Sequence, residues 1–217
     1  MPAQTNLKSI GRIAVLTTYG YIAIQIAFAG FLLWRNAIYR AYFDNQSGIA
    51  ETDAAVWMDE ISVPLSTAYV IGIVLTLIIN GRWIYLAARN ANLAHPGPDR
   101  ISAGWAVGWY LVPIMNFFKP YQAMVQIWTA SVGAVRGTGN AVPGWFGLWW
   151  GSWVVLGIAD RIIGRVADGQ WSDPDGLLRW NLVTAVSCLL WLIPAVLFIR
   201  IIREVTQAQF SQAEIFA

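Results

Sequence analysis

The sequence predicts an all-α fold: a polytopic transmembrane helix bundle that forms a single integral membrane domain over residues 1–217. Hydrophobic residues make up 57% of the chain and charged residues only 12%, about half the share found in soluble domains. Several apolar runs are also long enough to cross the roughly 30 Å hydrocarbon core of a bilayer. We therefore expect about four full spans and one proline-broken helical hairpin.

Each full span should match one membrane crossing in length, at 1.5 Å of helix per residue. The spans are expected at about residues 14–34, 63–86, 145–163 and 181–201. Gln25 lies near the middle of the first, where an amide predicts a hydrogen bond to another helix. Residues 35–61 carry scattered charges and predict a loop, with an apolar stretch at 54–58 that suits a short interfacial helix. Pro194 predicts a kink in the last span.

The hairpin is expected at residues 101–135, where Lys119 is the only charged residue. A straight helix of that length would be about 50 Å long, which is too long for one crossing. Pro113 and Pro120 each disfavour a continuous helix. The expected parts are an arm at 101–114, a turn at 115–120 and a return arm at 121–135. The hairpin either re-enters the membrane from one side or makes two short crossings.

The candidate functional residues lie in this hairpin and just before it. Lys119, beside Asn116 and Tyr121, could meet an anionic group on a solute. The alternative is that Lys119 only extends from the turn to the membrane interface. Arg82, near the end of the second span, is either an interfacial anchor or a functional charge within the membrane. The full set of candidates is Arg82, Pro113, Asn116, Lys119, Pro120 and Tyr121.

Small residues and one pair of charges give further expectations for packing. The glycine pairs 104/108 and 147/151 have the GxxxG spacing that allows close helix contacts in membranes. Asp160 and Arg161 are adjacent and therefore do not face each other on a helix. We expect each to pair with some other residue, either at the surface or between helices.

The residue types argue against most catalytic and metal chemistry. His95 and Cys188 are the only histidine and cysteine, so the usual Cys/His zinc and iron–sulfur sites cannot be built. We find no paired carboxylates, Ser–His pair or HExxH motif, and expect no catalytic residue, cofactor or metal. Asp173 and Asp175 lack the other ligands of a calcium loop. A net charge of +2 does not indicate nucleic-acid binding.

The distribution of Lys and Arg predicts the orientation, because these residues are enriched on the cytoplasmic side of membranes. With both termini inside and the hairpin returning to its side of entry, about nine Lys and Arg lie inside and five outside. If residues 101–118 crossed the membrane instead, the count would be about eight against six. The loops at 35–61 and 166–180 are acidic, which is consistent with an outside position. We therefore expect cytoplasmic N- and C-termini.

Two ordered motifs resemble the signatures of a known family. The first is RWIYLAARNA at 82–91, and the second is GWAVGWYLVPIMNFFKPYQ at 104–122, followed by WTAS at 128–131. On these residues the chain resembles the bacterial multi-pass membrane proteins of domain of unknown function 4328 (DUF4328), over about residues 60–205. The resemblance implies a bacterial cytoplasmic membrane and makes the hairpin the hallmark of the family. It implies no activity.

Three classes of function follow from these observations. The favoured one is a non-enzymatic membrane module that binds a partner protein or a lipid, or forms a homo-oligomer, since GxxxG spacings and tryptophans are abundant and catalytic groups are absent. The alternative is a small transporter or channel with a solute site at the broken hairpin, because broken helices at membrane depth hold many such sites. An intramembrane enzyme is the least favoured class.

Overall fold

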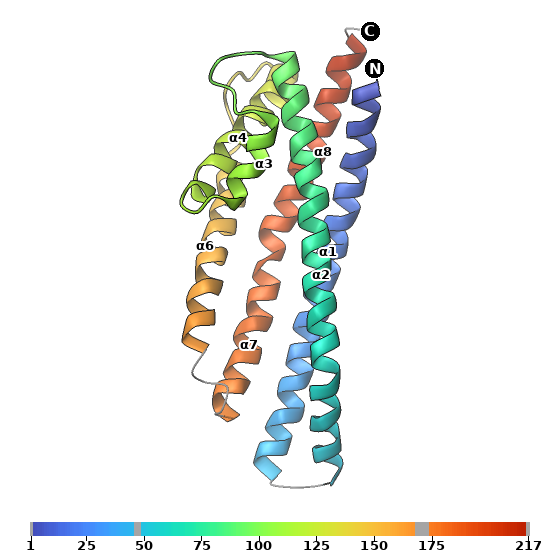
Figure 1. Cartoon of the computed structure of the whole chain (residues 1–217), viewed down its shortest axis with the longest axis vertical. Helices are drawn as coiled ribbons and strands as arrows, with labels where there is room; N and C mark the ends of the chain where they lie inside the picture. The colour runs from blue at the N-terminus through green and yellow to red at the C-terminus, as the bar shows by residue number, and fades with distance from the viewer. Residues whose placement is uncertain (1, 46–48, 168–173, 216–217) are drawn as a thin grey trace. The chain divides into compact units, whose positions relative to one another are not determined.

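The computed structural model describes residues 2–45, 49–167 and 174–215, and every element in these ranges is helical, as the sequence predicts. The long helices are α1 (Pro2–Asn45), α2 (Ile49–Ala94), α6 (Gly144–Ala167), α7 (Pro174–Leu190) and α8 (Leu192–Ile215) (Figure 1). The short ones are α3 (Ala103–Gly108), η1 (Trp109–Leu111), η2 (Met115–Phe117), α4 (Lys119–Trp128), the π-helix η3 (Thr129–Gly133) and α5 (Ala134–Arg136).

The chain folds into two compact units. Unit 1 contains residues 1–19, 75–151 and 194–217, and unit 2 contains residues 20–74 and 152–193. Helices α1 and α2 are each divided, with one segment in unit 1 and the other in unit 2. Helices α3 and α4 belong to unit 1, and α7 belongs to unit 2. Each unit therefore combines segments that are far apart in the sequence.

Three helical stretches of the described residues are long and apolar enough to cross a membrane. They are Leu7–Asp44, Thr52–Ala94 and Pro174–Gln212, and they contain three of the four expected spans. The fourth expected span, at 145–163, forms α6 but is not among these stretches. Four tryptophans lie near its start. Indole rings lower the mean hydropathy of a segment, although they favour the membrane interface.

The expected loop at 35–61 is wrong, because α1 and α2 together occupy nearly all of it. Arginine and alanine are good helix formers, and neither Gly nor Pro interrupts residues 31–45. The longer helices also bury apolar surface, since Tyr39 of α1 and Met58 of α2 share one buried cluster. The stretch at 54–58 is accordingly part of α2 rather than a separate interfacial helix.

Prolines explain where the last span is interrupted. Helix α7 ends at Leu190 and α8 begins at Leu192, so the helix that was expected to kink at Pro194 is interrupted at Trp191, three residues earlier. Proline has no N–H, and its ring clashes with the carbonyl four residues earlier, which here is that of Leu190. Pro64 by contrast lies inside α2, which continues across it. Membrane helices tolerate such prolines where neighbouring groups satisfy the freed carbonyl.

The region expected to form a hairpin has two unequal arms in unit 1, with a break between them (Figure 1). The first arm is α3 followed by η1, and it packs against α4. It is about 15 Å long, half of a hydrocarbon core. The return arm begins at Lys119 and runs through α4, η3 and α5 to Arg136. The first helical arm is thus much shorter than the 101–114 segment that the sequence predicts.

Unit 1 is held together along α8, where Ile201 and Ile202 are buried. The Trp83 indole N–H of α2 donates to Thr206 Oγ1 of α8 at 3.0 Å. A Cβ atom added at Gly11 of α1 would lie only 2.7 Å from the same Oγ1. Three helices therefore approach one another closely at Thr206, and Gly11 is the residue that lets α1 come near.

The GxxxG spacings do not mark close helix contacts within the described chain. A Cβ atom added at Gly104, Gly147 or Gly151 would meet no atom within 4 Å. A close contact in unit 2 is instead at Gly72 of α2, where an added Cβ would lie 2.6 Å from Ile24 Cδ1 of α1. Glycine spacing alone predicts a helix surface without large side chains, but it does not say whether that surface packs against another helix.

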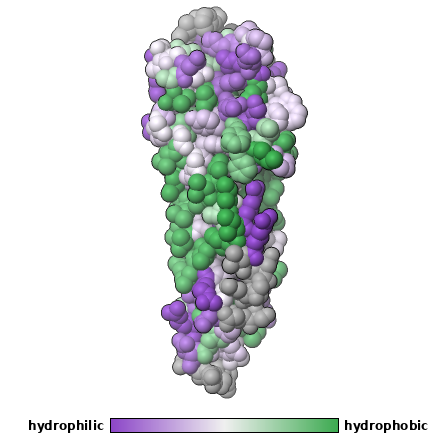
Figure 2. Space-filling view, turned by 90° about the vertical axis from the view of Figure 1, so that its left-hand side faces the viewer, coloured by the Kyte–Doolittle hydropathy of each residue, from purple (hydrophilic) through white to green (hydrophobic). Residues whose placement is uncertain are grey.

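Unit 2 packs α1 against α2 and α7 through small buried clusters. Ala29 and Leu32 of α1 are buried together with Ala185 of α7, and the Phe28 ring stacks on Tyr69 of α2 with centroids 4.3 Å apart. Many large apolar side chains remain exposed on the outer faces of the helices. Figure 2 shows them as green areas that cover much of one face, as expected for a surface in contact with lipid.

Candidate functional site

Asp160 of α6 is held in unit 2 by two hydrogen bonds from neutral groups. The Ser187 hydroxyl of α7 donates to Asp160 Oδ1 at 2.6 Å. The Trp191 indole N–H, at the break between α7 and α8, donates to Oδ2 at 2.8 Å. The expected pairing of Asp160 is thus confirmed as an interhelical contact. Because hydrogen bonds to a carboxylate are strong, these two fix the direction in which it points.

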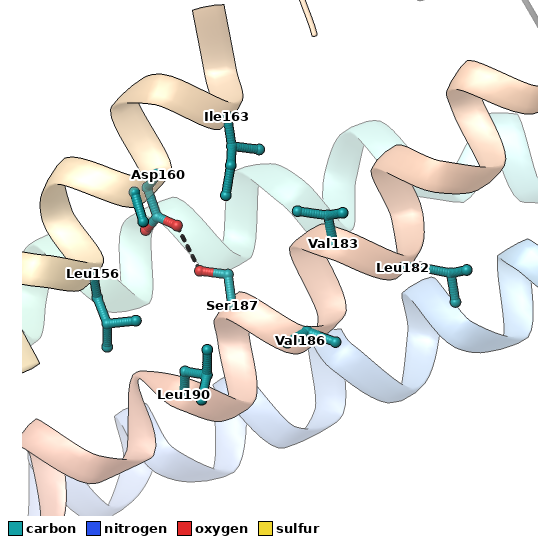
Figure 3. A pocket seen from close by; sticks show the side chains of 9 residues that line it. Leu156, Asp160, Ile163, Leu182, Val183, Val186, Ser187 and Leu190 are labelled. Atoms are coloured by element: carbon teal, nitrogen blue, oxygen red, sulfur yellow. Dashed lines mark hydrogen bonds between the residues drawn. The ribbon is translucent and has the colours of Figure 1, made fainter. Parts of the chain in front are cut away.

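Asp160 and Ser187 lie in the wall of a cleft between α6 and α7 (Figure 3). This α6–α7 cleft has a volume of about 250 Å³. Its other lining residues are all aliphatic: Leu156, Ala159, Ile163, Leu182, Val183, Val186 and Leu190. Sites for small molecules are typically apolar clefts in which a few polar groups fix the orientation of the ligand. The α6–α7 cleft has this composition on a small scale.

A second polar group in unit 2 lies between α1, α2 and α7. The Tyr69 hydroxyl donates to Gln25 Oε1 at 2.7 Å, which confirms the interhelical hydrogen bond predicted for Gln25. Gln25 Nε2 donates to the Tyr21 hydroxyl at 2.5 Å, and the Tyr69 hydroxyl oxygen lies 3.8 Å from Cys188 Sγ. Since Gln25 is buried, these bonds offset the free energy needed to remove its amide from water.

Two asparagines of unit 2 are buried with unsatisfied polar atoms. Among the described residues, neither polar atom of the Asn181 side chain on α7 has a hydrogen-bond partner. Asn36 Oδ1 on α1 has none among them either. Asn36 follows Leu32 by one helical turn and Asn181 precedes Ala185 by one turn. Leu32 and Ala185 share a buried cluster, so both asparagines lie along the α1–α7 contact. An unpaired buried amide group costs about 1–3 kcal/mol, which makes this layer a weak point in the packing.

The break of the hairpin contains a strained γ-turn at Ile114. This residue has φ 68° and ψ −53°, and the Met115 N–H donates to the Pro113 carbonyl at 2.8 Å. Such turns are rare, and a positive φ is especially unfavourable for a β-branched residue. The Trp150 indole N–H of α6 donates to the Phe117 carbonyl at 2.9 Å and so ties the turn to the rest of unit 1.

Lys119, Asn116 and Pro120 surround this turn but have different environments. Lys119 Nζ donates to Gln122 Oε1 at 3.1 Å on the exposed side of α4. Pro120 is buried in the first turn of the same helix. Asn116 Oδ1 is buried and has no hydrogen-bond partner among the described residues. Lys119 and Asn116 therefore lie near the same turn, but the structure records no hydrogen bond between their side chains.

The remaining sequence candidates have separate surroundings. Arg82 is exposed on α2, with its Cζ 5.5 Å from the centroid of the Tyr85 ring. Tyr121 packs edge-on against Phe146 of α6, with ring centroids 6.0 Å apart, and Pro113 is exposed. The functional role of these candidates stays a prediction.

Sequence reasoning missed the α6–α7 cleft, although it identified Asp160 as a residue with a partner. The signal was present in the helical spacing, since Leu156, Asp160 and Ile163 lie on one face of α6. Val183 and Leu190 lie with Ser187 on one face of α7. What the spacing does not contain is the pairing of these two faces, because a helical period does not say which other helix a face contacts.

The described residues contain no group of three or more His, Cys, Asp or Glu side chains that could hold a metal ion. Asp173, one of the two acidic residues considered for a weak cation site, lies outside the described residues. That the protein uses no metal or cofactor stays a prediction.

Comparison with known proteins gives one match. The model of a protein family described as a domain of unknown function (DUF4328) matches residues 46–207, about three quarters of the chain. The matched region includes the hairpin motifs and both helices of the α6–α7 cleft. No curated protein matches the chain, and no solved structure does.

Proposed function

As the chain belongs to the DUF4328 family, whose description records no activity, we propose from its own residues that it is a non-enzymatic integral membrane module that binds a lipid. The α6–α7 cleft is the observation that carries this proposal. Its aliphatic walls suit an acyl chain, and Asp160 and Ser187 are the two polar residues that line it. Because lipid tails are as apolar as the cleft walls, shape and polar contacts would decide the affinity.

The charges of the two units support a cytoplasmic position for both termini. Unit 1, which contains the two termini, has nine Lys and Arg against three Asp and Glu. Unit 2 has five Lys and Arg against nine Asp and Glu. Since Lys and Arg are enriched on the inner side of membranes, this asymmetry favours the cytoplasmic side for the termini in unit 1. The resemblance of the hairpin motifs to the family's signatures supports the cytoplasmic membrane of a bacterium as the location.

The short first arm supports a re-entrant hairpin rather than two crossings. A segment of about 15 Å cannot span a hydrocarbon core of about 30 Å. In a re-entrant hairpin, Thr138 after the return arm lies on the cytoplasmic side. A Thr138→Cys variant in a Cys188→Ser background should therefore resist an impermeant thiol reagent in intact cells. Labelling at 138 without permeabilising the cells would show that the segment crosses.

Lipid binding can be tested by filling the α6–α7 cleft. Val186 in the cleft and Val70 on α2 are 56% and 55% exposed, so Val186→Trp and Val70→Trp add the same side chain at equally exposed positions. We expect native mass spectrometry in mild detergent to find a retained lipid on the wild type and on Val70→Trp, but not on Val186→Trp. Equal retention by all three proteins, or none by the wild type, would contradict the proposal.

A small transporter or channel is the second candidate, and the hairpin favours it. The strained turn at Ile114 and the unsatisfied Asn116 Oδ1 resemble features of binding sites at broken helices. Lys119 would then meet an anionic solute. If proteoliposomes that contain Lys119→Ala matched the wild type in every flux assay, Lys119 would have no such role.

A partner protein or a second copy of the chain is a further alternative. The GxxxG faces at 104 and at 147/151 have no close neighbour among the described residues, so they leave room for another helix. Crosslinking in native membranes, followed by determination of the mass of the adduct, distinguishes a homo-oligomer from a complex with another protein.

A further inference from the structure

We propose that the α6–α7 cleft selects a cationic amphiphile, a molecule with an alkyl chain and an ammonium group, and that Asp160 provides the selection. This inference rests on the proposed lipid binding and adds the charge of the ligand. In this arrangement the alkyl chain lies against the aliphatic walls and the ammonium group lies at Asp160 (Figure 3).

The hydrogen bonds of Asp160 hold its charge in place without neutralising it. Ser187 and Trp191 are both neutral donors, and each bonds to a different oxygen of the carboxylate. A carboxylate oxygen can accept more than one hydrogen bond, so these two bonds leave each oxygen with an unused lone pair. An ammonium group beside this charge is attracted more strongly than in water, because the aliphatic walls lower the effective dielectric constant.

The described part of the chain does not supply a cation to this carboxylate. The ion pairs recorded among its residues are Arg35–Asp59, Arg136–Glu204 and Arg200–Glu204. Asp160 belongs to none of them. The adjacent Arg161 is exposed and lies about 100° around the helix from Asp160, so it does not face the cleft. A ligand with its own positive charge would complete the site.

The shape of the cleft suits a narrow chain. It is open on one side and has a volume of about 250 Å³, and its aliphatic residues come from both helices, among them Leu156 of α6 and Val183 and Leu190 of α7. An alkyl chain can therefore lie between α6 and α7 without separating them.

The test uses two photoactivatable probes with the same dodecyl chain and diazirine, one ending in trimethylammonium and the other in a hydroxyl group. Full-length protein is reconstituted in phosphatidylglycerol vesicles, which contain no ammonium lipid, then irradiated and digested, and labelled peptides are identified by mass spectrometry. Labelling of 156–163 and 182–190 is divided by labelling of the exposed apolar face of α2 at 63–75, which corrects for partitioning into the bilayer.

We expect the ammonium probe to label the cleft at least about tenfold more than the hydroxyl probe, because only the ammonium probe has a positive charge that the Asp160 carboxylate can attract. Asp160→Asn keeps the size of the side chain and should abolish this preference. Asp160→Glu keeps the charge and should retain it. Asp175→Asn, which changes an exposed acid at the start of α7, should behave as the wild type.

The outcomes separate this inference from the function on which it rests. Equal labelling of the cleft by both probes would overturn the selection of cations and leave lipid binding intact. A preference that survives in Asp160→Asn would overturn the role of Asp160. Cleft labelling no higher than that of the α2 face, with either probe, would overturn both proposals. Both proposals would also be overturned if the protein formed a larger complex in which a partner protein occupied the cleft.

Discussion

The two units of the chain differ in charge and in the contacts made by one buried amide side chain in each. Unit 1 is basic and unit 2 is acidic. In unit 1, Gln209 Nε2 of α8 donates to the Ala87 carbonyl of α2 at 3.0 Å and to Ser131 Oγ of η3 at 2.8 Å. In unit 2, neither polar atom of the buried Asn181 side chain has a partner among the described residues.

Buried polar atoms without a recorded partner occur in both units, such as Asn116 Oδ1 and Gln209 Oε1 in unit 1, so the units differ mainly in the contacts that their polar side chains do make. In unit 1 they connect helices: Gln212 Nε2 of α8 donates to the Ala130 and Ser131 carbonyls at 3.3 Å each, where the wider π-helix presents them. Glu204 forms ion pairs with Arg136 at 2.9 Å and Arg200 at 2.7 Å. In unit 2 the Asp160 carboxylate lies in the wall of the α6–α7 cleft. We therefore expect the polar contacts of unit 1 to contribute mainly to stability, and we propose ligand binding for unit 2.

The largest effect on stability is expected from Trp83→Ala in unit 1. Trp83 is 0% exposed, contacts the Phe198 ring edge-on at 5.7 Å and donates to Thr206. Truncation removes these contacts and leaves a cavity, so the free energy of unfolding should fall by about 3–5 kcal/mol. Reversible unfolding in a mild detergent measures it. Trp34→Ala in unit 2, where the side chain is 52% exposed, should have a clearly smaller effect; equal losses would break the comparison.

A matched pair of substitutions tests the contrast in buried amides. Gln209→Leu removes two hydrogen bonds and leaves Ser131 and the Ala87 carbonyl without this donor, so it should lower the free energy of unfolding by about 1–3 kcal/mol. Asn181→Leu makes a comparable chemical change at a buried amide without recorded partners and should leave stability unchanged or higher. The same unfolding measurement applies. The reverse order would show that Asn181, rather than Gln209, is the amide that holds helices together.

The smallest expected effect is a gain from Ile114→Gly in the hairpin turn. Ile114 is 67% exposed, so the substitution loses little apolar burial. Removing the strain of a positive φ should raise stability by about 1 kcal/mol, partly offset by the greater freedom of glycine in the unfolded chain. Ile114→Ala keeps the strain and should show no gain. A loss of stability with glycine would mean that the Ile114 side chain itself is needed, for example to contact lipid or a partner.

The sequence was sufficient for features that depend on one segment. The helical class, the irregularity near Pro194 and the hydrogen bond of Gln25 all follow from residues read within a single apolar run. The charges of 35–61 were misleading, because arginine and acidic side chains can lie on the exposed face of a helix whose other face is buried. In this stretch the buried face includes Tyr39 and Met58.

The candidate site depends on contacts between segments, and there the sequence was insufficient. Ser187 and Trp191 bind Asp160 from 27 and 31 residues away, and no spacing rule selects them from the other polar residues of the chain. Glycine spacing likewise predicted faces at 104 and 147/151 that have no close neighbour, whereas the isolated Gly11 and Gly72 lie where helices approach. Tertiary packing decides which of several suitable faces is used.

The most direct test of the central claim is the position of a bound amphiphile in unit 2. Crystals grown with a bromoalkyl trimethylammonium compound would locate its bromine by anomalous scattering. We predict a bromine peak between α6 and α7, beside Leu156 and Val183, that is lost in Asp160→Asn. A peak only at the hairpin of unit 1, or one of equal height in Asp160→Asn, would contradict the assignment of ligand binding to the cleft at Asp160.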